Sequence, residues 1–249
     1  MRIAMWSGPR NLSTAMMYSF GNRPDCAVWD EPFYAAYLDK TGLDHPMRAE
    51  TIAAGEPDPK RVAARLAAPA PDAKPVFYQK HMTQHMLEGF PVDWMEGMQH
   101  IFLIRQPARV IASYHAKREN PTLGDIGFSQ QAKIFDSVYG TPVVIDSDDI
   151  LRAPEAALRA LCAAIGLDFS PQMLHWPKGG HKNDGAWAPH WYSAVWQSEG
   201  FSPKVSAAPT LTPEGDALRK LAQPFYDHLS AHKLAIPADL RPLSSSRMM

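Results

Sequence analysis

Short apolar runs alternate with longer helix-forming stretches along most of this chain. Five runs of five residues have the length of β-strands, and they cover residues 2–6, 26–30, 75–79, 100–104 and 142–146. Helical composition is clearest over residues 108–119, 128–139, 154–166 and 212–233. The last of these stretches starts with Thr212 as a predicted N-cap and with Pro213 in the first helical position.

Strands that are apolar on both faces and alternate with helices predict a parallel sheet covered on two sides. We therefore expect an α/β fold, in the form of a single-domain three-layer sandwich with a central parallel sheet of about five strands. The expected domain spans residues 1–240, followed by a tail over residues 241–249. Two stretches with weak periodicity, residues 33–75 and 176–206, are expected to form a lid or an acceptor site.

Composition narrows the class of protein. The 25 Lys and Arg residues against 26 Asp and Glu give no overall basic field, so we expect no nucleic-acid partner. The two cysteines, Cys26 and Cys162, lack metal-type spacing and favour a reducing, cytoplasmic location. No stretch approaches the roughly 18 apolar residues of a membrane span, so we expect no membrane association. The sequence leaves the oligomeric state open, a homo-oligomer included.

The stretch MWSGPRNLSTAMM, residues 5–17, places a tight turn between the first strand and the first helix. Backbone amides at such a turn and the positive end of the helix dipole favour a bound phosphate or sulfate. The pattern GxxxxGK[ST] can be laid over this turn, but Ser13 replaces its second glycine and Thr14 its lysine, which leaves Arg10 as the cation. The plain alternative is a Gly-Pro turn and a helix with no ligand.

A second anion site is predicted at the end of the fourth strand. In the stretch IFLIRQPARVIASYHAKR, Arg105 ends the apolar run and Ser113 follows eight residues later. A guanidinium group and a hydroxyl group together can bind a second phosphate. Two phosphate sites in one small domain indicate a bisphosphorylated nucleotide.

Three stretches in this order resemble the P-loop sulfotransferases that use 3′-phosphoadenosine 5′-phosphosulfate, in a bacterial branch: SGPRNLSTAMM, FLIRQPARVIASYHAK and VVIDSDDILRAPEAALRALCAAIGLDF. The resemblance covers residues 2–169 and implies a P-loop NTPase-like fold. It also implies sulfuryl transfer to a hydroxyl or amine of a small-molecule acceptor, with adenosine 3′,5′-bisphosphate as the product and without a metal. The chain departs from the family pattern at Leu12, where glycine is usual, and at Gln106, where aspartate is usual.

The resemblance assigns roles to individual residues. Those expected to bind the co-substrate are Ser7, Gly8, Pro9, Arg10, Asn11, Leu12, Ser13, Thr14, Arg105 and Ser113, with Lys178, Gly179, Gly180 and Lys182 in a loop over the 3′-phosphate. Arg10 is also expected to stabilise the leaving group. The catalytic base is expected to be Glu31, after the second strand, or His81, after the third, and geometry has to decide between them. Their plain alternatives are a helix-start carboxylate and a structural histidine.

Two other functions stay open at this stage. A P-loop small-molecule or nucleotide kinase shares the scaffold and would use Asp146 for magnesium, but the missing loop lysine counts against it. A catalytically inactive nucleotide-binding module would account for Leu12 and Gln106. The four-residue spacing of His81 and His85 is only a weak sign of a metal pair, because the glutamate of the HExxH motif is absent.

Overall fold

A five-stranded parallel sheet carries the fold in the computed structural model, which describes residues 1–115, 121–202 and 209–237. The strands are β1 (Arg2–Ser7), β2 (Cys26–Asp30), β3 (Val76–Met82), β4 (Gln99–Ile104) and β5 (Val143–Asp146). Their order in the sheet is β2-β3-β1-β4-β5, and every neighbouring pair is parallel. All carboxyl ends therefore meet at one edge, which is where open α/β sheets bind ligands.

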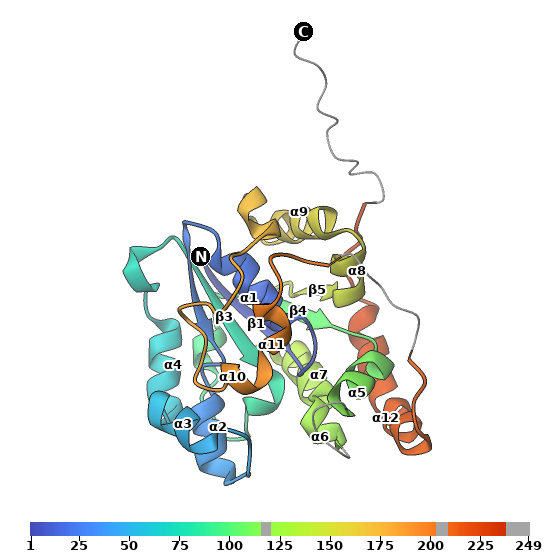
Figure 1. Cartoon of the computed structure of the whole chain (residues 1–249). Helices are drawn as coiled ribbons and strands as arrows, with labels where there is room; N and C mark the ends of the chain where they lie inside the picture. The colour runs from blue at the N-terminus through green and yellow to red at the C-terminus, as the bar shows by residue number, and fades with distance from the viewer. Residues whose placement is uncertain (116–120, 203–208, 238–249) are drawn as a thin grey trace.

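Helices surround the sheet, and α10 and α11, drawn in orange, pass in front of it in Figure 1. The α-helices are α1 (Ser13–Gly21), α2 (Tyr34–Thr41), α3 (Arg48–Ala54), α4 (Pro59–Ala67), α5 (Pro107–His115), α6 (Leu123–Ile126), α7 (Phe128–Ser137), α8 (Ser147–Arg152), α9 (Pro154–Ala164), α10 (Ala188–Trp191), α11 (Ser193–Trp196) and α12 (Pro213–Ser230). Short 3-10 helices are η1 (Pro71–Ala73), η2 (Thr83–His85), η3 (Asp93–Met95) and η4 (Pro171–Leu174).

Alternate residues of β1, β4 and β5 contribute to two separate cores. Trp6 of β1 lies in a cluster with apolar side chains of α4, α5, α7 and α12, whereas Met5 lies in a cluster with those of α1, α8 and α9. Successive strand residues point to opposite faces, so a sheet covered on both sides needs apolar residues at both. The predicted α/β sandwich around a five-stranded parallel sheet is confirmed.

Most predicted boundaries shift by only one or two residues. β2 and the start of α12 lie where the sequence places them, and the hydroxyl of Thr212 accepts a hydrogen bond from the amide of Gly215 at 3.1 Å. The predicted helix over residues 108–119 is α5, which ends at His115; residues 116–119 lie outside the described residues. The prediction for β3 was wrong at its end, because the strand continues beyond residue 79 to Met82.

Buried polar side chains inside β3 explain why the sequence pattern predicts an end of the strand at residue 79. Lys80 is paired with two carboxylates, and the ring of His81 stacks on that of Trp6 with centroids 4.6 Å apart. Polar groups with partners do not interrupt a buried strand. His81 therefore lies within β3 rather than after it. His81 and His85 do not share a helix, because His85 belongs to η2.

The described part of the chain holds no helix that is both long enough and apolar enough to cross a membrane. The predicted tail over residues 241–249 lies outside the described residues. Part of the predicted segment over residues 176–206 also lies outside them, since the description stops at Ser202 and resumes at residue 209.

Gly8 lies directly after β1, against the corner between α6 and α7. A Cβ at this position would lie 2.5 Å from the backbone oxygen of Ile126. We expect Gly8→Ala to lower the free energy of unfolding by about 1–3 kcal/mol, because the backbone of the corner must move. Urea denaturation measures the effect. Gly124→Ala is the control, since its nearest contact would be an ordinary 3.6 Å; an equal loss in both variants would contradict the prediction.

Candidate functional site

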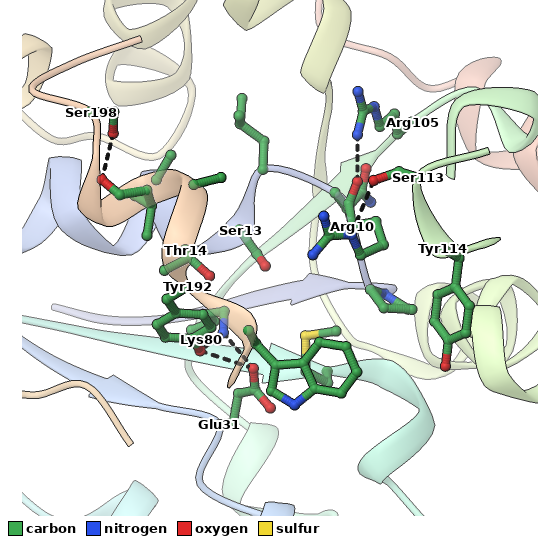
Figure 2. Close-up of a pocket in the computed structure, with 18 of the residues that line it drawn as sticks. Arg10, Ser13, Thr14, Glu31, Lys80, Arg105, Ser113, Tyr114, Tyr192 and Ser198 are labelled. Atoms are coloured by element: carbon green, nitrogen blue, oxygen red, sulfur yellow. Dashed lines mark hydrogen bonds and ion pairs between the residues drawn. The ribbon is translucent and has the colours of Figure 1, made fainter. Parts of the chain in front are cut away.

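A pocket of about 380 Å³ opens at the carboxyl ends of the strands, a size typical of small-molecule sites. Figure 2 shows its lining residues as two groups with Ser13 and Thr14 between them. We call the group formed by Arg10, Arg105 and Ser113 the cationic end. The second group consists of Glu31, Lys80 and Tyr192. Together with Asp30, which contacts Lys80 and Tyr192 but does not line the pocket, we call it the acidic end.

The loop between β1 and α1 turns through two left-handed residues. Arg10 has a φ of 61° and Leu12 a φ of 67°, in the region that favours glycine. Leu12 therefore adopts the backbone of the expected glycine, at a cost of about 1–2 kcal/mol. Within the described residues no backbone or side-chain acceptor binds the amides of five loop residues, namely Arg10, Asn11, Leu12, Ser13 and Thr14. These amides can bind an anion.

Buried side chains hold this loop from the protein side. Asn11 donates from Nδ2 to the backbone oxygen of Leu103 at 2.5 Å. The hydroxyl of Ser147 lies 3.1 Å from the backbone oxygen of Asn11 and 2.9 Å from that of Ile104. Asn11, which is predicted to contact the co-substrate, lines the pocket, while its buried side chain fixes the loop to β4.

At the cationic end, the two predicted anion sites are in direct contact. Arg10 donates from Nε to the hydroxyl of Ser113 at 3.0 Å, and Arg105 donates from Nη1 to the backbone oxygen of Arg10 at 2.6 Å. Nε of Arg105 is buried and has no hydrogen-bond partner among the described residues. Among the described residues, no carboxylate forms an ion pair with Arg10 or Arg105. Burial lowers the pKa of both guanidinium groups. These uncompensated donors favour an anion.

At the acidic end, one ammonium group holds three oxygen atoms. Lys80 donates from Nζ to Asp30 at 2.9 Å, to Glu31 at 2.5 Å and to the hydroxyl of Tyr192 at 2.6 Å. That hydroxyl also accepts from Nε1 of Trp187 at 2.9 Å and lies 2.8 Å from Oδ2 of Asp30. Burial alone would lower the pKa of Lys80, but the two carboxylates outweigh it and leave the pKa raised. Lys80 therefore stays charged at neutral pH.

Glu31 is the carboxylate of this group that lines the pocket. It directly follows β2 with a φ of 38°, a strained conformation of the kind found at functional sites. Burial raises its pKa and Asp30 raises it further, while Lys80 opposes both. A carboxylate with a raised pKa takes up a proton near neutral pH more readily than a surface glutamate, as a general base requires.

Seven predicted site residues do not line the pocket: Ser7, Gly8, His81, Lys178, Gly179, Gly180 and Lys182. Strand alternation turns His81 away from the side chain of Lys80 and into the core. There it stacks between Trp6 and Trp94, and burial lowers its pKa to about 3. Lys178 and Lys182 are exposed to solvent.

Gln106, where the family pattern has aspartate, has a hydrogen-bond partner of its own. Gln106 donates from Nε2 to the hydroxyl of Tyr226 at 2.9 Å, and that hydroxyl donates to Oδ2 of Asp146 at 2.7 Å. Asp146 also accepts from the amide of Asp148 and so caps α8. Because Asp146 is buried and does not line the pocket, it is not placed to hold magnesium for a kinase. No three His, Cys, Asp or Glu side chains in the described ranges gather as metal ligands.

Sequence reasoning left Lys80, His85 and Tyr192 out of the site. A lysine within a buried strand is a signal for Lys80, because a buried ammonium group needs carboxylates and Asp30 ends the neighbouring strand. Tyr192 follows Asp30 by 162 residues, and no local pattern joins them.

A family model described as "Sulfotransferase domain" matches residues 1–233 of this chain. A sulfotransferase domain from the Synechococcus PCC 7002 olefin synthase superposes with a TM-score of 0.53 at 17% identity, covering 89% of this chain and 94% of that domain. A sulfotransferase domain from the curacin biosynthetic pathway also gives a TM-score of 0.53, at 14% identity, covering 94% and 98%. At these identities the superpositions show a shared fold.

Two Arabidopsis thaliana proteins are similar over most of this chain. They are named branched-chain-amino-acid aminotransferase-like protein 1 and protein 2, and each is 36% identical over 233 residues, which is 92% of this chain. The chain spans 42% of the length of the first and 41% of the second. Their names therefore describe proteins of which this chain matches less than half.

Lys80→Met leaves Asp30 and Glu31 buried without a cation. We expect the free energy of unfolding to fall by about 3–5 kcal/mol at about pH 8. The loss should be smaller at about pH 5.5, because the pKa of Glu31 is raised in the folded protein, so stability is gained as the pH falls through that pKa. Urea denaturation at both pH values measures this. Lys220→Met, which removes an exposed i,i+4 ion pair, is the control. If Lys80→Met lowered the free energy of unfolding equally at both pH values, the charge of Glu31 would not be the cause.

Proposed function

The chain belongs to the sulfotransferase domain family, and we propose that it transfers a sulfuryl group from 3′-phosphoadenosine 5′-phosphosulfate to a hydroxyl or amine of a small-molecule acceptor. One observation carries this proposal: a single pocket has, at one end, guanidinium groups that form no ion pair with a carboxylate among the described residues and, at the other end, a buried carboxylate. Sulfuryl transfer needs both, because negative charge grows on the leaving phosphate while the acceptor loses a proton.

The residues at the cationic end fit a doubly phosphorylated nucleotide. The buried Nε of Arg105 lacks a partner, and the loop amides have no acceptor within the described residues. Both are donors, and phosphate oxygens would satisfy them. When bound, the nucleotide would supply an activated sulfuryl group. We assign Arg105 and Ser113 to binding and Arg10, with the loop amides, to stabilising charge on the leaving group.

Glu31 is the proposed base. The acceptor oxygen or nitrogen forms a bond to sulfur, the bond from sulfur to the phosphate oxygen breaks, and the acceptor proton passes to a carboxylate oxygen of Glu31. Glu31 lines the pocket, whereas His81 is enclosed by tryptophan rings in the core. Lys80 and Tyr192 contact the Oε1 atom of Glu31. The Oε2 atom has no hydrogen bond to any described residue, and Nδ1 of His85 lies 3.8 Å from it. Oε2 is therefore the oxygen that can accept the proton.

The geometry favours this reaction over a magnesium-dependent kinase. The loop has Thr14 where a kinase loop has lysine, and Asp146 is engaged by a tyrosine and a helix amide. The positive φ of Leu12 also weakens the case for an inactive module, because the loop keeps its glycine-like backbone without glycine.

Adenosine 3′,5′-bisphosphate is expected to bind without added magnesium. Arg105→Ala should weaken this binding by about 10- to 100-fold, because a hydrogen bond to a charged group contributes about 1.5–3 kcal/mol. Isothermal titration calorimetry measures the affinity. Arg159→Ala, which removes a surface pair with Glu155, serves as the control. Tighter binding of magnesium–ATP than of the bisphosphate would support the kinase instead.

Glu31→Gln should lower turnover by about 10²- to 10⁴-fold. In the unaltered protein, activity should fall as the pH drops through the pKa of Glu31, which burial raises above the usual range for glutamate. A pH–rate profile of sulfuryl transfer measures both effects. Glu155→Gln on the surface should retain full activity, and an acid limb that persisted in Glu31→Gln would assign the base elsewhere.

A further inference from the structure

A single hydroxyl group beside the proposed base contacts four side chains among the described residues (Figure 2). The Oη atom of Tyr192 lies 2.6 Å from Nζ of Lys80 and 2.9 Å from Nε1 of Trp187. It also lies 2.8 Å from Oδ2 of Asp30 and 3.2 Å from Oε1 of Glu31. Because Tyr192 is only 5% exposed, these neighbours rather than bulk water satisfy its hydroxyl.

The neighbours of this hydroxyl fix the direction of its proton. Lys80 and Trp187 can only donate, so they occupy the acceptor sites of the oxygen. The proton of the hydroxyl therefore points to the carboxylates, with Oδ2 of Asp30 nearer than Oε1 of Glu31. Burial, followed by the charges of Asp30 and Glu31, raises the pKa of Tyr192 well above the usual range. The hydroxyl thus keeps this proton at neutral pH.

Lys80 has no donor to spare in this arrangement. Its ammonium group carries three protons, and its three acceptors among the described residues are Asp30, Glu31 and Oη of Tyr192. Without the hydroxyl, Asp30 would lose a donor and Lys80 alone would balance two buried carboxylates. The position and the charge of Glu31 therefore depend on a hydroxyl group from a distant segment of the chain.

The chain around Tyr192 holds this hydroxyl in place. The amide of Tyr192 donates to the backbone oxygen of Ala188 at 2.8 Å, at the end of α10. The amide of Gly185 donates to Oδ2 of Asp30 at 3.2 Å, which ties the same segment to the end of β2. The ring belongs to a buried cluster with Tyr34, Tyr37, Leu38, Trp187 and Ala188. A side chain that is locked by packing and hydrogen bonds can orient its partners.

From these contacts we propose that Tyr192 is a positioning residue for the base. Its hydroxyl group holds Lys80 and Asp30 so that Oε1 of Glu31 stays bound, while Oε2 is left for the proton of the acceptor. This inference rests on the proposed function, since it takes Glu31 as the base. It goes beyond that function because it makes proton transfer depend on residues 185–192, which join the site from outside the sheet.

The charged and titratable groups that face Glu31 determine how it responds to the loss of this hydroxyl. Among the described residues they are Asp30 in β2, Lys80 in β3, His85 in η2, Tyr34 in α2, and Tyr192. His85 stays neutral because burial lowers its pKa well below the usual range, and Tyr34 stays protonated because burial and Glu31 raise its pKa. Burial raises the pKa of Glu31, whereas Lys80 and the hydroxyl of Tyr192 lower it. Removal of the hydroxyl should therefore raise the pKa of Glu31 further.

Tyr192→Phe tests the proposal, because it removes the hydroxyl and keeps the ring. NMR follows the side-chain carboxyl carbons of isotope-labelled glutamates as the pH is varied, and the signal of Glu31 is assigned by its loss in Glu31→Gln. We expect this signal to titrate at higher pH in Tyr192→Phe than in the unaltered protein. With phenol as the probe acceptor, sulfuryl transfer at neutral pH should fall by about 10- to 100-fold, the range for one hydrogen bond to a charged group. The acid limb of its pH–rate profile should move to higher pH, because Glu31 is then protonated at higher pH.

Tyr78→Phe is the matched control. Tyr78 is buried and does not line the pocket, and its hydroxyl has no hydrogen-bond partner among the described residues. This variant should change neither the titration of Glu31 nor the rate of transfer. Calorimetry should find the affinity for adenosine 3′,5′-bisphosphate unchanged in both variants, because the cationic end is untouched.

The outcomes separate this inference from the proposed function. If Glu31 titrates at the same pH in Tyr192→Phe as in the unaltered protein, the inference is wrong even where transfer slows, because the hydroxyl then supports packing alone. A loss of bisphosphate binding equal to the loss of transfer would also overturn it, since Tyr192 would then support the whole pocket. The proposed function fails separately, if the unaltered protein binds no bisphosphate and transfers no sulfuryl group; the NMR titration does not depend on either result.

Discussion

The backbone of the loop between β1 and α1 is the constraint on which the cationic end depends. It contains two left-handed residues, Arg10 and Leu12, and five of its amides have no acceptor among the described residues. Asn11 and Ser147 hold this conformation from inside by hydrogen bonds to β4. The backbone strain is thus offset by buried polar contacts, and the donors are arranged before a ligand arrives. Arrangement in advance is what makes such donors effective in catalysis.

The acidic end depends on the register of two neighbouring strands. Asp30 at the end of β2 lies opposite Lys80 of β3, so the ion pair follows directly from the parallel pairing. Glu31 comes next in the chain and shares the same ammonium group. Tyr192, which directly follows α10, contacts this group from a segment far away in the sequence. Opposite charges therefore face each other across two neighbouring strands of one sheet.

Local patterns predict the sheet and the loop, because apolar runs and a Gly-Pro turn act over a few residues. They fail at β3, where a paired lysine and a stacked histidine lie inside the strand although polar residues usually mark strand ends. The choice between Glu31 and His81 as the base depends on strand alternation, which turns His81 into the core, and a wrong strand end conceals this. Tyr192 reaches the site through a contact between segments far apart in the sequence, and no pattern in one sequence reveals it.

The division of charge in the pocket has a consequence for turnover. On the proposed chemistry, the acceptor gains a negatively charged sulfuryl group beside the carboxylate of Glu31. Repulsion would then favour its departure, whereas Arg10 and Arg105 would still attract the phosphates of the spent nucleotide. The proposal thus implies an order of release, with the sulfated compound leaving first and the nucleotide last.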